Sequence, residues 1–319
     1  MSLPPALVLT AGLGTRLRPL TYVRAKAAVP VNGEALAHRV ARWLAGYGCS
    51  EQVFNLHHQP SSVAACLGDG ADLGVRISYS WEQPVLGSAG GPRHALPLLI
   101  DGGSPRFLIV NGDTLTNVDL HAVLDRHQRS GALVTMALIA NPAPEKYGGV
   151  TVTADGFVSG FTRRNAATRS HHFIGVQVVE AVVFAALEDG VPHESVGALY
   201  PELMRQSPHA VAAHVSDASF RDIGTPGDCL ATSLALACDE GDRLVSAGAW
   251  VARSAVVERT ALWDDVRIDG GARLTECIVA DGCHIEGHLH LRRCAVVPAE
   301  SHVPADDERI EHGLLIRPL

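Results

Sequence analysis

Short apolar runs alternate with helix-like patterns over about the first 130 residues of the chain. The runs have the length of strands, and the segments between them repeat apolar residues every three or four positions, which is typical of amphipathic helices. Strands are expected at 6–10, 52–57, 75–80 and 106–111, and helices at 35–48, 61–68, 88–99 and 119–131. This alternation predicts a mostly parallel, doubly wound α/β sheet with helices on both faces, and ligands bind beyond the carboxyl ends of such strands.

From about residue 132 the apolar runs follow one another without helices between them ("ALVTMALIA", "GGVTVTA", "GFVSGFTRR", "HFIGVQVV"). Consecutive strands of this kind predict an antiparallel extension of the sheet that closes over a pocket. Helices are expected near 195–206 and 226–238, and "CDEGDR" (238–243) is expected to be a linker. The first domain is therefore predicted to span residues 1–240.

A repeat of seventeen residues follows the linker. Rows of that length over 245–302 align three columns of apolar residues: Val245, Leu262, Val279 and Val296; Val251, Ile268 and Ile285; Val257, Leu274 and Leu291. Within a row these residues lie six apart, which is the hexapeptide pattern of a parallel β-helix. We expect a second domain at 243–319, with Cys277 and Cys294 stacked on neighbouring coils at ~4.8 Å. The columns break at His302 and Glu308, after about three coils.

Charge and cysteine content exclude several classes of protein. The formal charge of -8 argues against a nucleic-acid or anionic-membrane partner. The seven cysteines are odd in number and form no CxxC pair, so they predict reduced thiols rather than disulfides or a zinc site. The doubled histidines at 57–58 and 171–172 are adjacent rather than one helical turn apart, so they favour no metal site. Without a membrane-length apolar run or a signal peptide, a cytoplasmic location is expected.

The buried run at the start of the chain leads into "AGLGTRLRPLT" (11–21). Glycines let backbone N–H groups lie close to a phosphate or a base, and Arg16, Arg18 and Lys26 add positive charge. The stretch is not a Walker A motif, because no Gly-Lys-Ser/Thr follows. It is not the dinucleotide fingerprint either, because Leu17 stands at the third glycine position. The pattern predicts a site for a phosphorylated ligand.

Five segments in order resemble the sugar-1-phosphate nucleotidyltransferases, the nucleotide-sugar pyrophosphorylases. These segments are "AGLGTRLRPLT" with the lysine downstream, "EQPVLGSAGG" (82–91), "LIVNGDTL" (108–115), "KYGGV" (146–150) and "FRDIGTPGD" (220–228). The resemblance covers nearly the whole chain and is closest to the mannose-1-phosphate guanylyltransferase branch. It implies a Rossmann-like nucleotidyltransferase fold with a short C-terminal left-handed β-helix.

The resemblance also implies a reaction and a set of site residues. A sugar 1-phosphate attacks the α-phosphorus of a nucleoside triphosphate and pyrophosphate leaves, which requires cations and positioning rather than a covalent nucleophile. The implied catalytic residues are Arg16, Lys26 and Asp113, and Asp113 and Asp222 are implied to hold Mg²⁺. The implied nucleotide-binding residues are Ala11, Gly12, Gly14, Thr15, Gln83, Gly87, Ser88 and Gly112. GTP as the nucleotide follows from branch similarity alone.

The sugar side departs from the family pattern. Where many members carry Glu-Lys-Pro, this chain has "GFVSGFTRRN", which puts Arg163 and Arg164 at the glutamate and lysine positions. Arg164 can still hold a phosphate, whereas Arg163 cannot accept hydrogen bonds from sugar hydroxyls. "HHFIGVQV" also stands where "NAG" is common, which places Gly175 on this side together with Gly148. The expected sugar-phosphate residues are therefore Gly148, Arg163, Arg164 and Gly175.

Three interpretations compete. The first is an enzyme for mannose 1-phosphate, or a uridylyl- or thymidylyltransferase for an unusual sugar-like phosphate. The second is a nucleotide-sugar-binding regulatory subunit without turnover, which has less need of Lys26, Asp113 and Asp222 together. The third is a hexapeptide-repeat acyltransferase, for which about three coils are too few. We favour the enzyme, and we expect a homo-oligomer because the last coil would otherwise expose strand edges.

Overall fold

The computed structural model describes residues 3–100, 102–166, 168–300 and 304–319. The chain divides into two compact units. The first contains Met1–Gly12, Val40–Pro60 and Leu67–Arg221, and the second contains Leu13–Arg39, Ser61–Cys66 and Asp222–Leu319. The boundary expected at 240–243 differs from this division, in which the second unit begins at Asp222 in the C-terminal part and also contains two early segments. None of the helices in the described ranges combines the length and apolar character that a membrane span needs.

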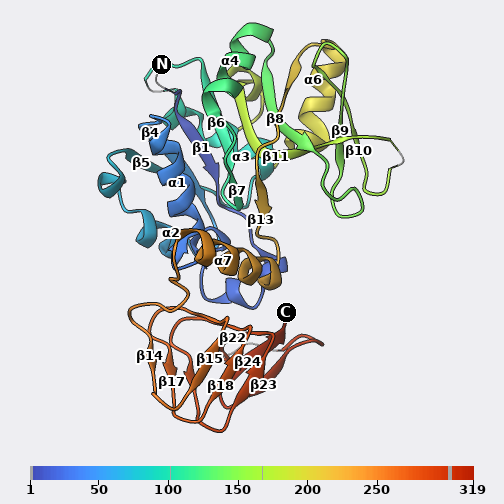
Figure 1. Cartoon of the computed structure of the whole chain (residues 1–319). Coiled ribbons are helices and arrows are strands. Elements are labelled where there is room, and N and C mark those ends of the chain that lie inside the picture. The colour runs from blue at the N-terminus through green and yellow to red at the C-terminus, as the bar shows by residue number, and fades with distance from the viewer. Residues whose placement is uncertain (1–2, 101, 167, 301–303) are drawn as a thin grey trace. The chain divides into compact units, whose positions relative to one another are not determined.

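A nine-stranded sheet forms the centre of the first unit (Figure 1). Its main path runs β10-β9-β11-β6-β1-β4-β5, and β8 and β12 extend it beside β11. The four strands of the parallel part are β1 (Ala6–Leu9), β4 (Glu51–Leu56), β5 (Arg76–Trp81) and β6 (Arg106–Asn111). Across the sheet these strands lie in the order β5, β4, β1, β6. The chain moves from β1 through β4 to β5 in one direction and then returns to β6 on the other side of β1, so the order reverses between β1 and β6. Ligands bind at such a switch point in open α/β sheets.

The helices of this part follow the predicted alternation. They are α1 (Leu36–Gly46), α2 (Pro60–Leu67), α3 (Gly87–Leu99) and α4 (Leu120–Ser130), with a 3₁₀ turn at Ala71–Leu73. The first residues of α1, up to Arg39, and Ser61–Cys66 of α2 group with the second unit. Local signals fix their ends. The Asp119 carboxylate accepts from the backbone N–H of His121 and of Ala122 at the start of α4, and Gly131 ends it with a φ of 64°. The prediction of a mostly parallel sheet is confirmed.

The predicted antiparallel extension is also present. Its strands are β8 (Val134–Ala140), β9 (Gly149–Val152), β10 (Val158–Thr162) and β11 (His171–Glu180), and β12 (Val211–Val215) adds parallel to β8. The long strand β11 pairs antiparallel with β6, β8 and β9 and so joins the extension to the main sheet. The remaining helices of the unit are α5 (Val182–Ala185), a π-helical turn at Ser195–Leu199 and α6 (Tyr200–Gln206).

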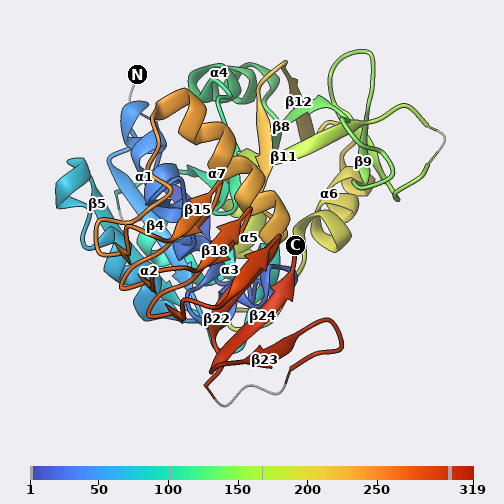
Figure 2. The same cartoon turned by 60° about the horizontal axis from the view of Figure 1, so that its bottom comes forward.

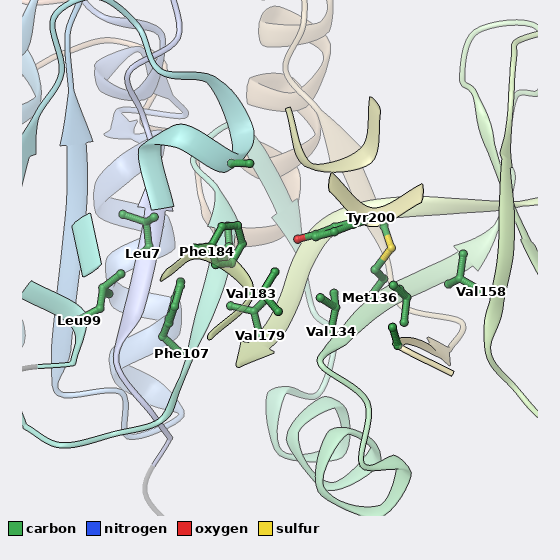
Figure 3. Packing of buried hydrophobic residues seen from close by; sticks show 14 of the residues in the cluster. Leu7, Leu99, Phe107, Val134, Met136, Val158, Val179, Val183, Phe184 and Tyr200 are labelled. Atoms are coloured by element: carbon green, nitrogen blue, oxygen red, sulfur yellow. The ribbon is translucent and has the colours of Figure 1, made fainter. Parts of the chain in front are cut away.

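The core of the first unit packs aliphatic strand residues against aromatic rings (Figure 3). Phe107 from β6 and Phe184 from α5 are fully buried, with ring centroids 5.8 Å apart. Tyr200 is also fully buried, and its hydroxyl donates to Oε1 of Gln177 at 2.8 Å. Burial raises the pKa of the Tyr200 phenol, which therefore stays neutral as a structural donor.

The second unit combines the early loop with the C-terminal part of the chain. The loop contains 3₁₀ turns at Thr15–Leu17, Leu20–Tyr22 and Lys26–Ala28 and a small hairpin of β2 (Pro30–Val31) and β3 (Glu34–Ala35). The chain passes into the unit through β13 (Phe220–Asp222) and continues as α7 (Pro226–Glu240). A reciprocal capping box starts α7: Thr225 Oγ1 accepts from the Asp228 N–H, and the Asp228 carboxylate accepts from the Thr225 N–H.

Three short sheets with parallel strands follow α7, and the third continues into two antiparallel strands. Figure 2 shows β15, β18 and β22 of these sheets. Their strands are β14 (Trp250–Val251), β17 (Arg267–Ile268) and β20 (His284–Ile285); β15 (Val256–Glu258), β18 (Arg273–Thr275) and β21 (His290–Arg292); β16 (Ala261–Leu262), β19 (Ile278–Val279) and β22 (Cys294–Pro298). Each strand pairs with the one seventeen residues later, for example Leu274 with Leu291. The predicted columns are the registers of these sheets, and their aliphatic residues form a buried cluster.

The cysteines are free thiols, as predicted, and the end of the repeat is covered by further strands. All seven cysteines are free and five are buried, and the Sγ atoms of Cys277 and Cys294 lie 3.6 Å apart. His302, where the columns were expected to break, lies outside the described residues. The open strand edge expected on the last coil is absent at β22, because β24 (Leu314–Pro318) pairs antiparallel with it and β23 (Arg309–Glu311) pairs with β24. The chain covers this edge with its own tail.

Candidate active site

The loops after β1 and β6 meet at the switch point of the sheet. The Gly112 N–H donates to the Leu9 carbonyl at 3.0 Å, and a Cβ at Gly112 would lie 2.6 Å from Cγ2 of Thr10. Only glycine fits this close approach of two backbones. The structure therefore brings Ala11 and Gly12 to one edge together with Gly112 and Asp113.

The four residues of this edge differ in exposure. Ala11 is buried and Gly12 is exposed, with open space where a side chain would stand. Asp113 is half-buried, and Thr114 Oγ1 donates to its Oδ1 at 3.5 Å. The edge thus presents bare backbone beside a carboxylate, which suits a ligand that carries phosphates and a cation.

A buried polar chain holds the loop after β1. Asn55, at the end of β4, accepts with Oδ1 from the N–H groups of Thr10 and Ala11 at 2.5 and 3.2 Å. Its Nδ2 donates to Oε1 of Glu82 at 2.7 Å, and Oε2 of Glu82 accepts from the Leu86 N–H at 2.8 Å. Glu82 is only 1% exposed. These bonds link the ends of three neighbouring strands to the start of α3.

Gly175 lies against the end of β6. Its φ is +76°, and a Cβ there would stand 2.7–2.8 Å from three atoms of the Asn111 side chain. The pairing of β11 with β8 shifts register between Phe173 and Gln177, so Gly175 sits in a bulge. The predicted sugar-side residue Gly175 is thereby placed next to the segment that carries Gly112.

Segment 193–195 covers the start of α3. The His193 carbonyl accepts from the N–H of Ala89 at 2.8 Å, and Ser88 Oγ donates to Oε2 of Glu194 at 2.7 Å. A Cβ at Gly87 would lie 2.8 Å from the His193 carbonyl oxygen. Ser88 and Gly87 are therefore engaged within the fold, while Gln83, two residues past β5, is exposed. Sequence inspection did not single out Glu194, because nothing local marks a partner 106 residues away.

The predicted sugar-side arginines lie in one turn. Arg163 and Arg164 directly follow β10 and are exposed. The N–H of the next residue, Asn165, donates to the Pro144 carbonyl at 2.9 Å, which ties the turn to the loop 141–148. Gly148 at the end of that loop is exposed, and a Cβ there would lie 2.9 Å from the Thr162 carbonyl oxygen. The structure therefore brings Gly148 and the arginine turn together.

An aromatic cluster beside this turn was missed by the sequence analysis. The ring of His172 lies 4.3 Å from that of Tyr147 and 4.6 Å from that of Phe220, centroid to centroid. Burial lowers the pKa of His172 to about 4, and a hydrogen bond to the Gly148 backbone opposes this shift. The only sequence signal was the doubled histidine, which does not reveal which ring faces inward on a strand.

The second unit contains five further residues of the predicted site: Gly14, Thr15, Arg16, Lys26 and Asp222. Gly14 has a φ of +60°, and a Cβ there would lie 3.0 Å from Cβ of Lys26. A Cβ at Gly224 would lie 3.1 Å from Nη1 of Arg16 and 3.3 Å from Oδ2 of Asp222. Arg16 and Asp222 thus surround the same glycine, although they are far apart in sequence. A shared metal ion between Asp113 and Asp222 stays a prediction.

Comparisons with known proteins identify the family of this chain. The nucleotidyl transferase family model matches residues 5–238. The chain is 29% identical over 301 residues to a mannose-1-phosphate guanylyltransferase of Mycobacterium tuberculosis, covering 90% of this chain and 83% of that protein. It is 34% identical over 227 residues to an N-acetylmuramate α-1-phosphate uridylyltransferase of Neisseria meningitidis, covering 69% and 93%.

A solved structure shows the same fold. HddC from Yersinia pseudotuberculosis superposes with a TM-score of 0.63 at 18% identity, covering 72% of this chain and 98% of that one. This likeness confirms the predicted Rossmann-like fold of the mostly parallel sheet. The family match covers well over half of the chain. The chain therefore belongs to the nucleotidyl transferase family.

Proposed function

We propose that this chain joins a nucleoside triphosphate to a sugar 1-phosphate and releases pyrophosphate, with GTP and a mannose-1-phosphate-like sugar as the leading substrates. The observation that carries the proposal is the meeting of the loops after β1 and β6, where Gly112 contacts Thr10 at the switch point. The similarity to sugar-1-phosphate nucleotidyltransferases supports the same class of reaction.

In this reaction an oxygen of the sugar phosphate forms a bond to the α-phosphorus while the bond from that phosphorus to the pyrophosphate oxygen breaks. No proton transfer to carbon and no covalent enzyme intermediate are needed. The backbone of Ala11 and Gly12 would lie along the triphosphate, because no side chain blocks it there. Arg16 and Lys26 would neutralise charge on the phosphates, with each charge-assisted hydrogen bond contributing ~1.5–3 kcal/mol.

The donor set suits Mg²⁺. Asp113 and Asp222 are both half-buried and offer carboxylate oxygens, which are the ligands that Mg²⁺ prefers. Bound there, Mg²⁺ would offset the charge that develops on the leaving pyrophosphate. Asp228, whose carboxylate is near Gly224 as well, caps α7 and is left out of this ligand set.

The sugar phosphate would bind on the side of Gly148, Arg163 and Arg164. A guanidinium holds a phosphate through two parallel hydrogen bonds, so Arg164 takes the role of the usual lysine. The bulge at Gly175 brings backbone close to Asn111 and leaves no room for a side chain between the sugar side and the β6 loop.

Pyrophosphate release tests the proposal. The full chain is assayed with GTP, UTP, dTTP, ATP and CTP, each with a panel of sugar 1-phosphates, at millimolar Mg²⁺. Turnover with one pair, lost on EDTA treatment and in Asp113→Asn and Asp222→Asn, supports it. Silence across the panel with intact nucleotide-sugar binding favours the regulatory subunit.

A second candidate is uridylyl transfer to a sugar phosphate that carries a carboxylate. Two observations favour it: Arg163 and Arg164 replace a Glu-Lys pair, and a relative at 34% identity acts on N-acetylmuramate 1-phosphate according to its name. A guanidinium at Arg163 can donate two parallel hydrogen bonds to a carboxylate, whereas it cannot accept one from a sugar hydroxyl. The panel therefore includes N-acetylmuramate 1-phosphate with UTP, and Arg163→Glu is expected to reverse a preference for it.

The C-terminal strands are proposed to form a short left-handed β-helix, because three parallel sheets with a common offset of seventeen residues describe stacked coils. Homo-oligomer formation stays a prediction. The argument from an open edge no longer holds at β22, which β24 covers. Light scattering on the full chain measures its mass in solution.

A further inference from the structure

Three chemistry-bearing side chains that the proposed reaction does not use gather on the C-terminal strands. Glu286 and His288 lie in the turn between β20 and β21, and His312 lies in the turn between β23 and β24. The antiparallel pairing of β24 with β22 and of β23 with β24 carries His312 back to the coil. Residues 24 positions apart are thus brought into contact by the tail that covers β22.

Their polar atoms lie at nearly equal separations. Nε2 of His288 is 3.2 Å from Nε2 of His312. Oε2 of Glu286 is 3.5 Å from Nδ1 of His288 and 3.6 Å from Nδ1 of His312. One ligand atom from each residue can be chosen with all three within 4.8 Å of one another. Ligands at ~2.0–2.1 Å in a tetrahedron around a metal ion stand about 3.3 Å apart. The two rings approach each other through Nε2, whereas Glu286 is near their Nδ1 atoms, so one donor from each residue gives a spacing up to 4.8 Å. Binding of an ion would require these side chains, which are exposed or half-buried, to rotate and draw together.

The donor types narrow the class of ion. Two imidazoles and one carboxylate form a mixed nitrogen and oxygen set, which suits Zn²⁺ and related transition metals, whereas Mg²⁺ and Ca²⁺ favour oxygen alone. One carboxylate also offsets half of the charge of a divalent ion. Three protein ligands leave a fourth position for water.

We infer that Glu286, His288 and His312 bind one Zn²⁺ ion. The ion links the turn after β20 to the turn before β24 and so fastens the tail that covers the edge of β22. It lies within the C-terminal strands and does not depend on the substrates of the proposed reaction. The alternative without a metal is that the two rings contact each other and Glu286 pairs with both imidazoles, and the titration below separates the two.

Another histidine of the same strands provides a matched control. Nε2 of His284 lies 2.8 Å from Oδ2 of Asp269, and its side chain is 52% exposed, close to the 59% of His288. His284→Ala therefore removes an exposed, carboxylate-paired imidazole from β20, the strand before the turn, without touching the proposed ligands.

The test titrates Zn²⁺ into the untagged full chain by calorimetry, with millimolar Mg²⁺ present to occupy oxygen-only sites. One Zn²⁺ per chain is expected. Affinity should fall at least about tenfold in His288→Ala, in His312→Ala and in Glu286→Gln, and it should be unchanged in His284→Ala. Equal affinity in His288→Ala, His312→Ala and the wild type, or absence of binding, overturns the inference.

Two further measurements guard against misfolding and against other ligands. Circular dichroism should be the same for all variants, because these side chains are exposed or half-buried, and Zn²⁺ should slow proteolysis of the tail in the wild type and not in His312→Ala. Co²⁺ in place of Zn²⁺ should give visible bands of tetrahedral coordination. An intense thiolate-to-Co²⁺ band would instead assign the metal to cysteine and overturn the inference.

Discussion

Arg24 holds Asp281 through two hydrogen bonds, in which Nε and Nη2 donate to the two carboxylate oxygens at 2.6 and 2.7 Å. Nη2 also donates to Oδ2 of Asp264 at 2.6 Å, and the guanidinium lies 5.5 Å from the centre of the Trp263 ring. Arg24 stands two residues before Lys26, in the loop that groups with the C-terminal strands. These contacts therefore tie the segment that is expected to meet the triphosphate to residues of the C-terminal strand region.

Arg24→Ala is predicted to weaken both the fold and the reaction. Asp281 would lose a partner in a half-buried place, which should lower the free energy of unfolding by about 1–2 kcal/mol. A looser loop would misplace Lys26, so kcat/KM in the proposed reaction should fall at least about tenfold. Urea denaturation and pyrophosphate release measure the two effects.

Arg267→Ala is the control, because Arg267 also pairs with a carboxylate, that of Asp269 at 3.2 Å, but lies on a coil strand. It should change stability by less than about 0.5 kcal/mol and leave kcat/KM unchanged. If Arg24→Ala matches the wild type in both measurements, the coils do not position the loop.

Local patterns explain what the sequence could predict. The strand expected at 106–111 has those bounds in β6, because a continuous apolar run and its flanking polar residues are local signals. The helix expected at 119–131 is α4 (Leu120–Ser130), and the two outer residues of the prediction, Asp119 and Gly131, are its caps. The registers of the C-terminal strands were recoverable because paired strands place buried aliphatic residues seventeen positions apart, as Ile268 and Ile285 are.

Long-range partnerships explain what it could not. Glu82 reads as an ordinary acidic residue after a strand, yet it is buried because Asn55 and the Leu86 N–H meet its two oxygens. Residues 13–39 group with the C-terminal part of the chain, and ion pairs such as Arg24 with Asp281 link the two, which no periodicity reveals. The implied roles of Asp113 and Asp222 likewise came from resemblance to a family.

Gly175→Ala is predicted to be among the most disruptive small substitutions in the first unit. The added Cβ meets Asn111 at 2.7–2.8 Å, and alanine is strained at a φ of +76°. We expect a loss of about 3 kcal/mol or more in the free energy of unfolding, because crowding adds to backbone strain. The measurement is urea denaturation followed by fluorescence.

Gly131→Ala separates the two causes. Gly131 has a similar φ of +64° but open space around its Cβ position, so only the backbone term of about 1–2 kcal/mol applies. Equal losses at both positions would contradict the crowding of Asn111 by residue 175.

Glu82→Gln is predicted to loosen the loop after β1. The carboxylate accepts from Asn55 and from Leu86, and an amide has only one acceptor oxygen, so one buried donor loses its partner. The cost should be about 1–3 kcal/mol in unfolding free energy. Because Asn55 holds the N–H groups of Thr10 and Ala11, KM for the nucleotide should rise more than kcat falls.

Glu51→Gln is a suitable comparison, since Glu51 is an exposed acid on β4 that pairs with Arg76. It should alter stability by less than about 1 kcal/mol and leave KM unchanged. A Glu82→Gln enzyme with an unaltered KM would mean that the polar chain supports the fold without shaping the nucleotide site.

His172 is predicted to make the chain acid-sensitive. Its pKa in the fold is lowered to about 4 by burial, while an unfolded histidine titrates near 6.5. Below about pH 6.5 the unfolded chain therefore binds a proton that the folded chain does not, so stability is lost as the pH falls from about 6.5 to 4. Partial exposure reduces the effect to about 1 kcal/mol between pH 7 and 5.

His172→Phe keeps a ring beside Tyr147 and Phe220 but cannot be protonated. Its unfolding free energy, measured in urea at pH 7 and pH 5, should fall by about 1 kcal/mol less than that of the wild type. His127 and His214, whose pKa values burial also lowers, are present in both proteins, so their contributions cancel in this difference. If the unfolding free energies of the wild type and His172→Phe fall equally between pH 7 and pH 5, the ring beside Gly148 takes up its proton without unfolding.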